Sequence, residues 1–281
     1  MEERLKIMAV MCHPADAIDH AGGTLCLHSR RGDQVSVVVC THGVDTHHTR
    51  RNELIRSGRL DEVSGLEDAI REKEEEASRG MEILGVRDVR FLRLKDDVVI
   101  QSRELIEAIA RELADVRPHL LILHNPTEEL GFAHQETAVA ALRACDLVKT
   151  SGYVRDAGDP LTPAQIFFIT MYGHTNQLSA EGRRFANVLV DITPVVEKKA
   201  RALDCVASQY YTGDLGRKCI EVTNGRMGLH SSLSYAEAYQ VLHPHVYSHL
   251  PANRFLMRQS SSSKSSRGEN LSVLLGRSHA G

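Results

Sequence analysis

Three side chains of the sequence combine the residue types and the placement that a catalytic metal site requires. His13 and Asp16 stand three residues apart on a turn that follows an apolar run, so both can point at one ion. His134 follows a second apolar run and supplies a third ligand from another part of the chain. Imidazole nitrogen and carboxylate oxygen are good zinc ligands, and three protein ligands with an open fourth position are typical of catalytic zinc. We therefore predict one divalent metal ion at these residues, with zinc as the first choice and iron as the alternative.

Alternating apolar runs and amphipathic stretches predict the elements that position these ligands. The apolar runs are short, rich in valine, leucine and isoleucine, and bounded by turn residues, as buried strands are. The predicted strands cover residues 5–12, 34–41, 88–94, 119–124 and 164–172. Other stretches carry apolar residues at helical spacing and end near glycine or before proline. The predicted helices cover residues 18–31, 66–84, 103–116, 135–148 and 193–208.

Strands that alternate with helices over short connections predict an α/β fold with a parallel sheet covered by helices. In such sheets, ligands bind at the carboxyl ends of the strands. The pattern therefore directs attention to the loops that begin at His13, Thr41, Lys95 and Asn125. The Gly22-Gly23 pair could suggest a phosphate cradle, but the chain has no G-x-G-x-x-G or P-loop lysine. Close packing of the helix backbone is the favoured reason for this pair.

The bulk composition excludes several classes of protein. A formal net charge of −3 gives no electrostatic case for nucleic acid. No apolar run reaches the roughly 18 residues that a membrane-spanning helix needs. The six cysteines form no C-x-x-C pair and favour a reducing, cytoplasmic compartment. Of the 281 residues, 1–257 are expected to form one domain, and the serine-rich stretch 258–281 a disordered tail.

Several segments, taken in order, resemble the zinc-dependent de-N-acetylases of the PIG-L/LmbE-like family. The first is HPADAIDHAGGTL at residues 13–25, which is similar to a motif usually written H-P-D-D-E or H-P-D-D-A and followed by Gly-Gly-Thr-Leu. The segment AHQETAVAALRA at residues 133–144 is similar to the second metal motif. Smaller matches are Thr41-His42-Gly43, VDIT at residues 190–193 and SYAEA at residues 234–238. The resemblance extends from residue 5 to about residue 250.

This resemblance implies a fold, a reaction and a set of ligands. The fold would be a Rossmann-like three-layer sandwich with a mostly parallel sheet, and the zinc ligands would be His13, Asp16 and His134. The reaction would be hydrolysis of an N-acetyl group from an amino sugar of the glucosamine type, or from its conjugate, by a zinc-activated water. The partner is thus a small N-acylated sugar. Relatives often form symmetric oligomers, so a homo-oligomer is one alternative for this chain.

The sequence departs from the family pattern where the general base belongs. The first aspartate of H-P-D-D is Ala15 here, the aspartate of the second motif is Ala133, and a histidine that often precedes that motif falls at Gly131. Loss of a general base typically costs about 10²–10⁴ in rate. The candidates to replace it are His42, His20 and Asp19, with His124 and either Glu128 or Glu129 as further alternatives. His42 and His20 are favoured because imidazole near pH 7 serves as base or acid. The residues expected at the substrate are Asp96, His124 and Glu129.

Two functions follow from these observations. The first is a zinc amidohydrolase that acts on an N-acyl amino sugar. The second is a catalytically impaired family member that binds a sugar or metabolite without turnover, as the change at Ala15 suggests. We favour the enzyme, because the metal ligands are all present. His47 and His48 lie beside Arg50 and are expected to belong to a mobile charged loop.

Overall fold

The computed structural model describes residues 4–127, 132–150, 163–170, 186–229, 232–253 and 257. Its strands are β1 Lys6–Met11, β2 Gln34–Thr41, β3 Asp88–Leu94, β4 Leu120–Leu123, β5 Gln165–Ile169, β6 Val188–Asp191 and β7 Ala236–Val241. The longer helices are α1 Asp16–Arg31, α4 Leu66–Ile83, α5 Arg103–Val116 and α6 Phe132–Lys149. The shorter ones are α2 Val44–His47, α3 Thr49–Arg56, α7 Val196–Leu203, α8 Asp214–Ile220 and α9 Arg226–Leu229.

The seven strands form one sheet in the order β3-β2-β1-β4-β5-β7-β6. Strands β1 to β5 run parallel, and β7 lies antiparallel between β5 and β6. This confirms the mostly parallel sheet that the alternation of strands and helices predicts. β1 lies at the centre of the parallel part with β2 on one side and β4 on the other. The loops after β1, β2 and β4 therefore meet at one edge of the sheet, as the carboxyl ends of parallel strands do.

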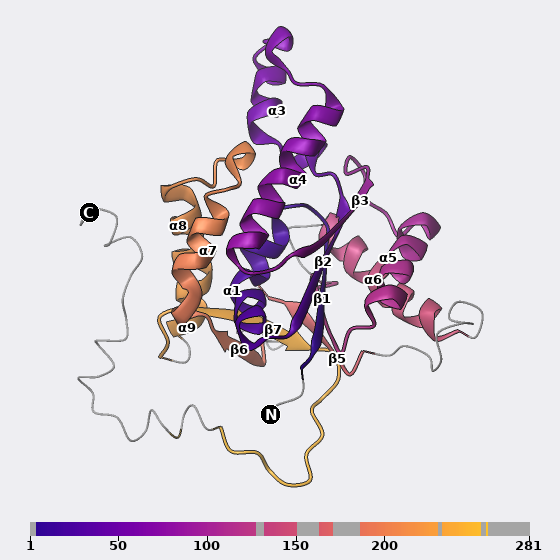
Figure 1. Ribbon diagram of the computed structural model, residues 1–281, viewed down its shortest axis with the longest axis vertical. Coiled ribbons are helices and arrows are strands. Elements are labelled where there is room, and N and C mark those ends of the chain that lie inside the picture. The colour runs from indigo at the N-terminus through magenta and orange to yellow at the C-terminus, as the bar shows by residue number, and fades with distance from the viewer. Residues whose placement is uncertain are drawn as a thin grey trace.

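Helices cover both faces of the sheet and make three layers (Figure 1). Side chains alternate along β1, so that Ile7 and Ala9 face one layer while Met8 and Val10 face the other. The first layer buries apolar residues of α1, α4 and α7, and the second buries those of α5 and α6. A strand that is covered on both faces must be apolar throughout. That requirement explains why β1 and β2 are continuous apolar runs in the sequence.

Gly23 lies where α1 approaches β7 and the turn after β6, and it confirms that the glycine pair serves close packing. A Cβ atom at Gly23 would lie 2.5 Å from Ile192 Cγ2. The amides of Gly23 and Thr24 also donate hydrogen bonds of 2.8 and 2.7 Å to the buried Glu237 carboxylate. The absence of a side chain at Gly23 therefore allows both Ile192 and Glu237 to reach the helix backbone.

The change Gly23→Ala should lower the free energy of unfolding by about 1–3 kcal/mol, the usual cost of overpacking a filled core. The measurement is urea unfolding followed by circular dichroism. Gly22→Ala is the matched control, because the tightest contact of its Cβ would be with the end of Leu84, at 3.1 Å, and that flexible side chain can move. Equal destabilisation by the two changes would show that the close contact between Gly23 and Ile192 has no special weight in stability.

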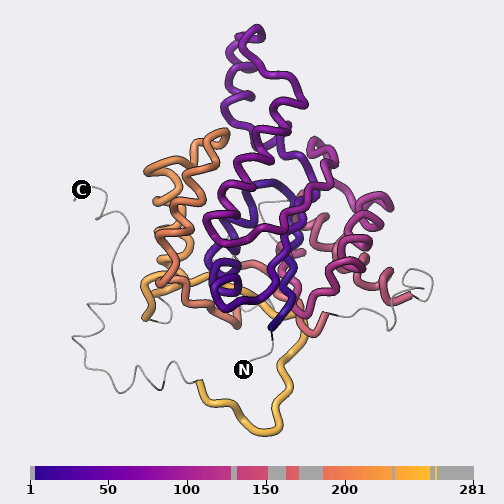
Figure 2. Tube along the Cα trace, in the orientation of Figure 1, coloured from indigo at the N-terminus to yellow at the C-terminus, as the bar shows by residue number. Residues whose placement is uncertain are grey.

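Two sequence expectations differ from the structure. The helix expected over 193–208 is shorter, because a 3-10 turn that contains Pro194 precedes α7 and Asp204 ends it by accepting hydrogen bonds from the Gly213 amide and Arg217. The segment expected as a charged loop contains α3, which projects with the start of α4 from the rest of the chain (Figure 2). In the described ranges, no helix is both long enough and apolar enough to cross a membrane. The expected tail, residues 258–281, lies outside these ranges.

Candidate metal centre

The turn between β1 and α1 carries the first two predicted ligands. Ala15 is the N-cap residue of α1, and its methyl side chain makes no capping hydrogen bond. The His13 backbone amide instead donates a hydrogen bond of 2.7 Å to Asp16 Oδ2. This bond holds the carboxylate beside the His13 ring. Only 2% of His13 and 6% of Asp16 is exposed, so the pair lies in a largely dry setting.

His134, in the first turn of α6, brings the third predicted ligand to the same point. Its Nε2 atom lies 3.3 Å from His13 Nδ1 and 3.4 Å from Asp16 Oδ2, and His13 Nδ1 lies 3.2 Å from Asp16 Oδ2. The three atoms form a nearly equilateral triangle. A tetrahedral ion with bonds of about 2.0–2.1 Å keeps its ligands about 3.3–3.4 Å apart. The donor set therefore fits one zinc-sized divalent ion.

His124 directly follows β4, lies beside Asp16 and His134, and is fully buried. Its Nε2 atom accepts a hydrogen bond of 3.0 Å from the Cys12 amide and lies 3.2 Å from Asp16 Oδ2. A backbone amide can only donate, so this nitrogen carries a lone pair, and its contact with Asp16 is one between two acceptors rather than an ion pair. A cation beside Asp16 makes such a contact favourable. The His124 ring stacks on His134 with centroids 4.0 Å apart, which orients the third ligand.

The electrostatics of the cluster favour a charged Asp16. Burial by itself would raise the pKa of the Asp16 carboxyl, but the imidazoles of His13 and His134 outweigh that effect and hold the pKa well below its ordinary value. The carboxylate is therefore ionised over the neutral range, which is the state a metal ligand needs.

The second turn of α1 carries two of the residues proposed to replace the base. His20 reaches the cluster, with its ring edge-on to His124 and His134 at centroid distances of 5.4 and 5.6 Å. Burial lowers the pKa of His20 well below its ordinary value, so the ring is neutral. Asp19 accepts a hydrogen bond of 3.2 Å from the Tyr211 hydroxyl, and burial raises its pKa. The ring of His20 thus lies beside a predicted metal ligand, His134, whereas Asp19 is bonded to Tyr211.

The loops after β2 and β3 contribute His42 and Asp96, which form a pair. His42 Nδ1 lies 2.8 Å from Asp96 Oδ1 and accepts a hydrogen bond of 3.2 Å from the Val44 amide. Asp96 also accepts from the amides of Asp45 and Thr46 and from the Thr46 hydroxyl. Burial alone would raise the pKa of Asp96, but these hydrogen bonds lower it. With 1% exposure, Asp96 holds the loop after β2 in place.

The sequence reasoning missed His47, which lies against the predicted ligand His13. Its ring centroid is 3.9 Å from that of His13, with an angle of 35° between the rings. The expectation that His47 belongs to a mobile charged loop is therefore wrong. Gly43, with φ at +65°, starts the one-turn helix α2 that turns His47 back over His13. Burial lowers the pKa of His47 to about 4. The Thr41-His42-Gly43 match at the start of this loop was the only sequence signal for it.

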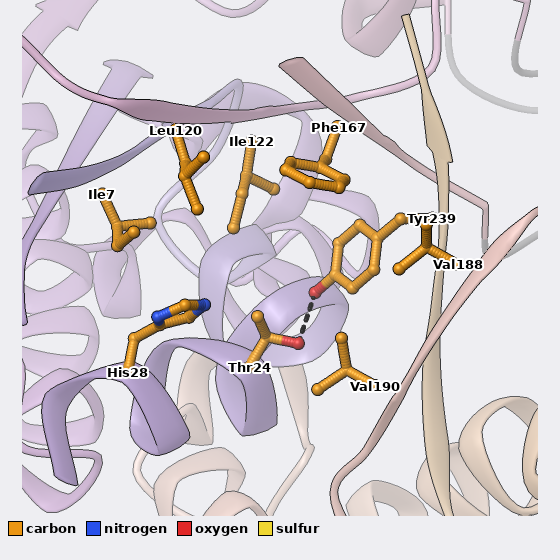
Figure 3. A pocket seen from close by; sticks show the side chains of 9 residues that line it. All are labelled: Ile7, Thr24, His28, Leu120, Ile122, Phe167, Val188, Val190 and Tyr239. Atoms are coloured by element: carbon orange, nitrogen blue, oxygen red, sulfur yellow. Dashed lines mark hydrogen bonds between the residues drawn. The ribbon is translucent and has the colours of Figure 1, made fainter. Parts of the chain in front are cut away.

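An apolar cavity elsewhere in the fold is distinct from this cluster (Figure 3). It holds about 100 Å³ near the amino ends of β1 and β4, where Ile7 and Leu120 line it. Its polar groups include the Thr24 and Tyr239 hydroxyls, which bond to each other at 2.8 Å. Among the described residues that line it, His28 is the one imidazole, and no carboxylate or thiol is present. Glu129, predicted to contact substrate, lies outside the described residues.

Comparisons with known proteins agree with the fold. Residues 8–145 match the model of the PIG-L family, described as GlcNAc-PI de-N-acetylase. This stretch begins in β1 and includes His13, Asp16 and His134. This match assigns residues 8–145 to the PIG-L family. The resemblance inferred from the motifs of the chain is thereby confirmed, and with it the expected fold.

Individual relatives of this chain carry out two kinds of reaction. The chain is 26% identical to the 4-oxalmesaconate hydratase of Pseudomonas putida over 254 residues, which is 86% of this chain and 91% of that enzyme. It is 28% identical to the diacetylchitobiose deacetylase of Thermococcus kodakarensis over 73% of this chain and 70% of that enzyme. The crystal structure of the 4-carboxy-2-hydroxymuconate hydratase from Pseudomonas putida superposes with a TM-score of 0.73 at 23% identity, covering 88% and 100% of the two chains. These relatives are therefore enzymes, and they catalyse different types of reaction.

Proposed function

We propose that this chain is a metal-dependent hydrolase that removes an N-acetyl group from an amino sugar or its conjugate. The observation that carries the proposal is the triangle of His13 Nδ1, Asp16 Oδ2 and His134 Nε2, whose edges of 3.2–3.4 Å suit one divalent ion. Zinc is the expected ion and iron the alternative. The description of the family and the diacetylchitobiose deacetylase support the choice of substrate.

The residues of the chain would each have a defined part in this reaction. His13, Asp16 and His134 would hold the ion, which when bound supplies a Lewis acid for the carbonyl oxygen and lowers the pKa of water. The Cys12 amide fixes His124, and His124 in turn orients His134 by stacking. His20 would remain neutral in its buried position beside them. We further propose that the protein works in a reducing cytoplasm, because its six cysteines are free thiols.

A second candidate reaction is hydration of a carbon–carbon double bond conjugated to a carboxylate. Two observations favour it: the residue at the usual base position is Ala15, and the hydratase relative aligns over 91% of its length. Hydration places OH on one carbon and hydrogen on its neighbour, so no amine leaves. The same ligand triangle would serve, because both reactions need activated water next to an oxygen that carries negative charge in the transition state.

Assays on zinc-loaded and iron-loaded full-length protein should separate these functions. The first substrate is N,N'-diacetylchitobiose, with amine release as the readout. The second is an unsaturated dicarboxylate, with loss of its ultraviolet absorbance as the readout. Amine release that disappears in His134→Ala would support the hydrolase, whereas loss of absorbance without amine release would replace it by the hydratase. Neither activity in a protein that binds about one metal ion per chain would favour binding without turnover.

A further inference from the structure

We propose that Asp96, Thr46 and His47 form a hydrogen-bonded relay that fixes the tautomer of His47 and leaves its Nε2 atom as a hydrogen-bond acceptor beside the metal ligands. His47 would thereby supply the hydrogen-bond acceptor that the family's usual aspartate would provide at the position of Ala15. The inference deepens the proposed function and rests on it for the role of this acceptor. The relay itself follows from contacts within the loop after β2.

The direction of the relay is determined by the Thr46 hydroxyl, which carries a single hydrogen. Thr46 Oγ1 lies 2.5 Å from Asp96 Oδ2, and an ionised carboxylate can only accept, so the hydroxyl hydrogen points at Asp96. Thr46 Oγ1 also lies 2.6 Å from His47 Nδ1. Because its hydrogen is already used, this oxygen must accept at the second contact. His47 therefore carries its hydrogen on Nδ1, and in the neutral ring Nε2 has the lone pair.

The position of His47 suits an acceptor for a bound water or substrate group. The ring lies on His13 at 3.9 Å and is partly exposed, whereas His13 and Asp16 are buried. His47 Nε2 has no hydrogen-bond partner among the described residues, while Nδ1 is bonded to Thr46. The ligand atoms of His13, His47 and Asp96 fall within 4.8 Å of one another, but His47 does not belong to the His13, Asp16 and His134 group. This placement suits a residue next to the ion rather than a fourth ligand.

A second contact holds the backbone of the same residue. Lys73 on α4 donates a hydrogen bond of 3.0 Å to the His47 carbonyl and another of 3.0 Å to Gln209 Oε1. The Lys73 ammonium is 1% exposed, and Glu76 on the same helix is the main group that offsets its charge. His47 is thus held at its ring by Thr46 and at its carbonyl by Lys73. A residue held at two points is preorganised, as an active-site acceptor needs to be.

The test compares Thr46→Val, which removes the hydroxyl, with Thr46→Ser, which keeps it. The direct readout is ¹⁵N NMR of histidine-labelled, full-length protein at neutral pH, with the His47 signals assigned from their loss in His47→Phe. We expect an Nδ1–H tautomer for His47 in the wild type and in Thr46→Ser, and a population of the Nε2–H tautomer in Thr46→Val. Ser57→Ala is the control, because it removes another hydroxyl of the same projecting segment, one that bonds only to the Leu54 carbonyl.

Activity and metal content complete the test. In Thr46→Val we expect kcat to fall by roughly 10–100-fold, the usual loss for a residue that orients an active-site group, with KM and metal content unchanged and with recovery in Thr46→Ser. His47→Phe should lower kcat further at unchanged metal content. A wild-type Nε2–H or doubly protonated ring, or loss of metal in His47→Phe, would overturn the inference. The NMR result requires no substrate, so failure of the proposed reaction leaves the relay itself separately tested.

Discussion

Replacing Asp16 with asparagine should empty the metal site and abolish activity while leaving the fold intact. Asp16 Oδ2 lies within 3.4 Å of the nitrogens of His13, His124 and His134, so its charge is the only one among these four groups that attracts a cation. Asparagine keeps the size of the side chain and an oxygen for the His13 amide, but not the negative charge. We expect metal content to fall from about one ion per chain to a small fraction, and activity to fall by more than the roughly 10–100-fold typical of an outer residue.

Metal content, by plasma mass spectrometry after dialysis against excess zinc, is the primary measurement for Asp16→Asn. Asp33→Asn is the matched control, because Asp33 also accepts a backbone hydrogen bond, from Leu5, and lies 2.7 Å from a histidine nitrogen, but stands at the start of β2. This control should keep its metal. If Asp16→Asn retained a full complement of zinc, the proposal of a three-ligand site would be wrong. The proposed class of reaction would then be wrong as well.

The largest stability effect is expected from breaking the buried ion pair between Lys199 of α7 and Glu237 of β7. The two groups lie 2.8 Å apart and neither side chain is exposed. In Glu237→Gln the Lys199 ammonium remains buried without its counter-charge, which typically costs about 3–5 kcal/mol. The amides of Gly23 and Thr24 lose a charged acceptor as well. For a chain of this size, we expect a fall of roughly 6–20 °C in the midpoint of thermal unfolding.

The control for this prediction is Glu107→Gln, which breaks the pair between Arg103 and Glu107 on the surface of α5. Arg103 is 91% exposed, so this change should cost less than about 1 kcal/mol. The double variant Lys199→Met with Glu237→Leu removes both charges and should unfold at a higher temperature than Glu237→Gln. Similar midpoints for Glu237→Gln and Glu107→Gln would show that the buried pair has no special weight in the stability of the fold.

The regular elements of the first half of the chain could be predicted closely because their signals are local. β2, β3 and α5 begin and end where the sequence places them, at Gln34–Thr41, Asp88–Leu94 and Arg103–Val116. In each case the apolar spacing and a terminal residue, such as the Ser102 N-cap of α5, agree. The later part is less regular, and the short β6 and β7 are recognisable only once β7 pairs with both β5 and β6.

The sequence by itself determined the parallel α/β arrangement and the proximity of the first two predicted ligands, since His13 and Asp16 share one turn and their spacing alone brings them together. The tertiary structure decided what surrounds them. His134 comes from α6, His124 from the loop after β4, and His47 from α2, and they meet because β4 and β2 pair with opposite sides of β1. Such proximity depends on strand pairing between distant segments, which local residue patterns do not encode. For that reason His47 was readable only as part of a charged loop, and its contact with His13 became evident in the folded chain.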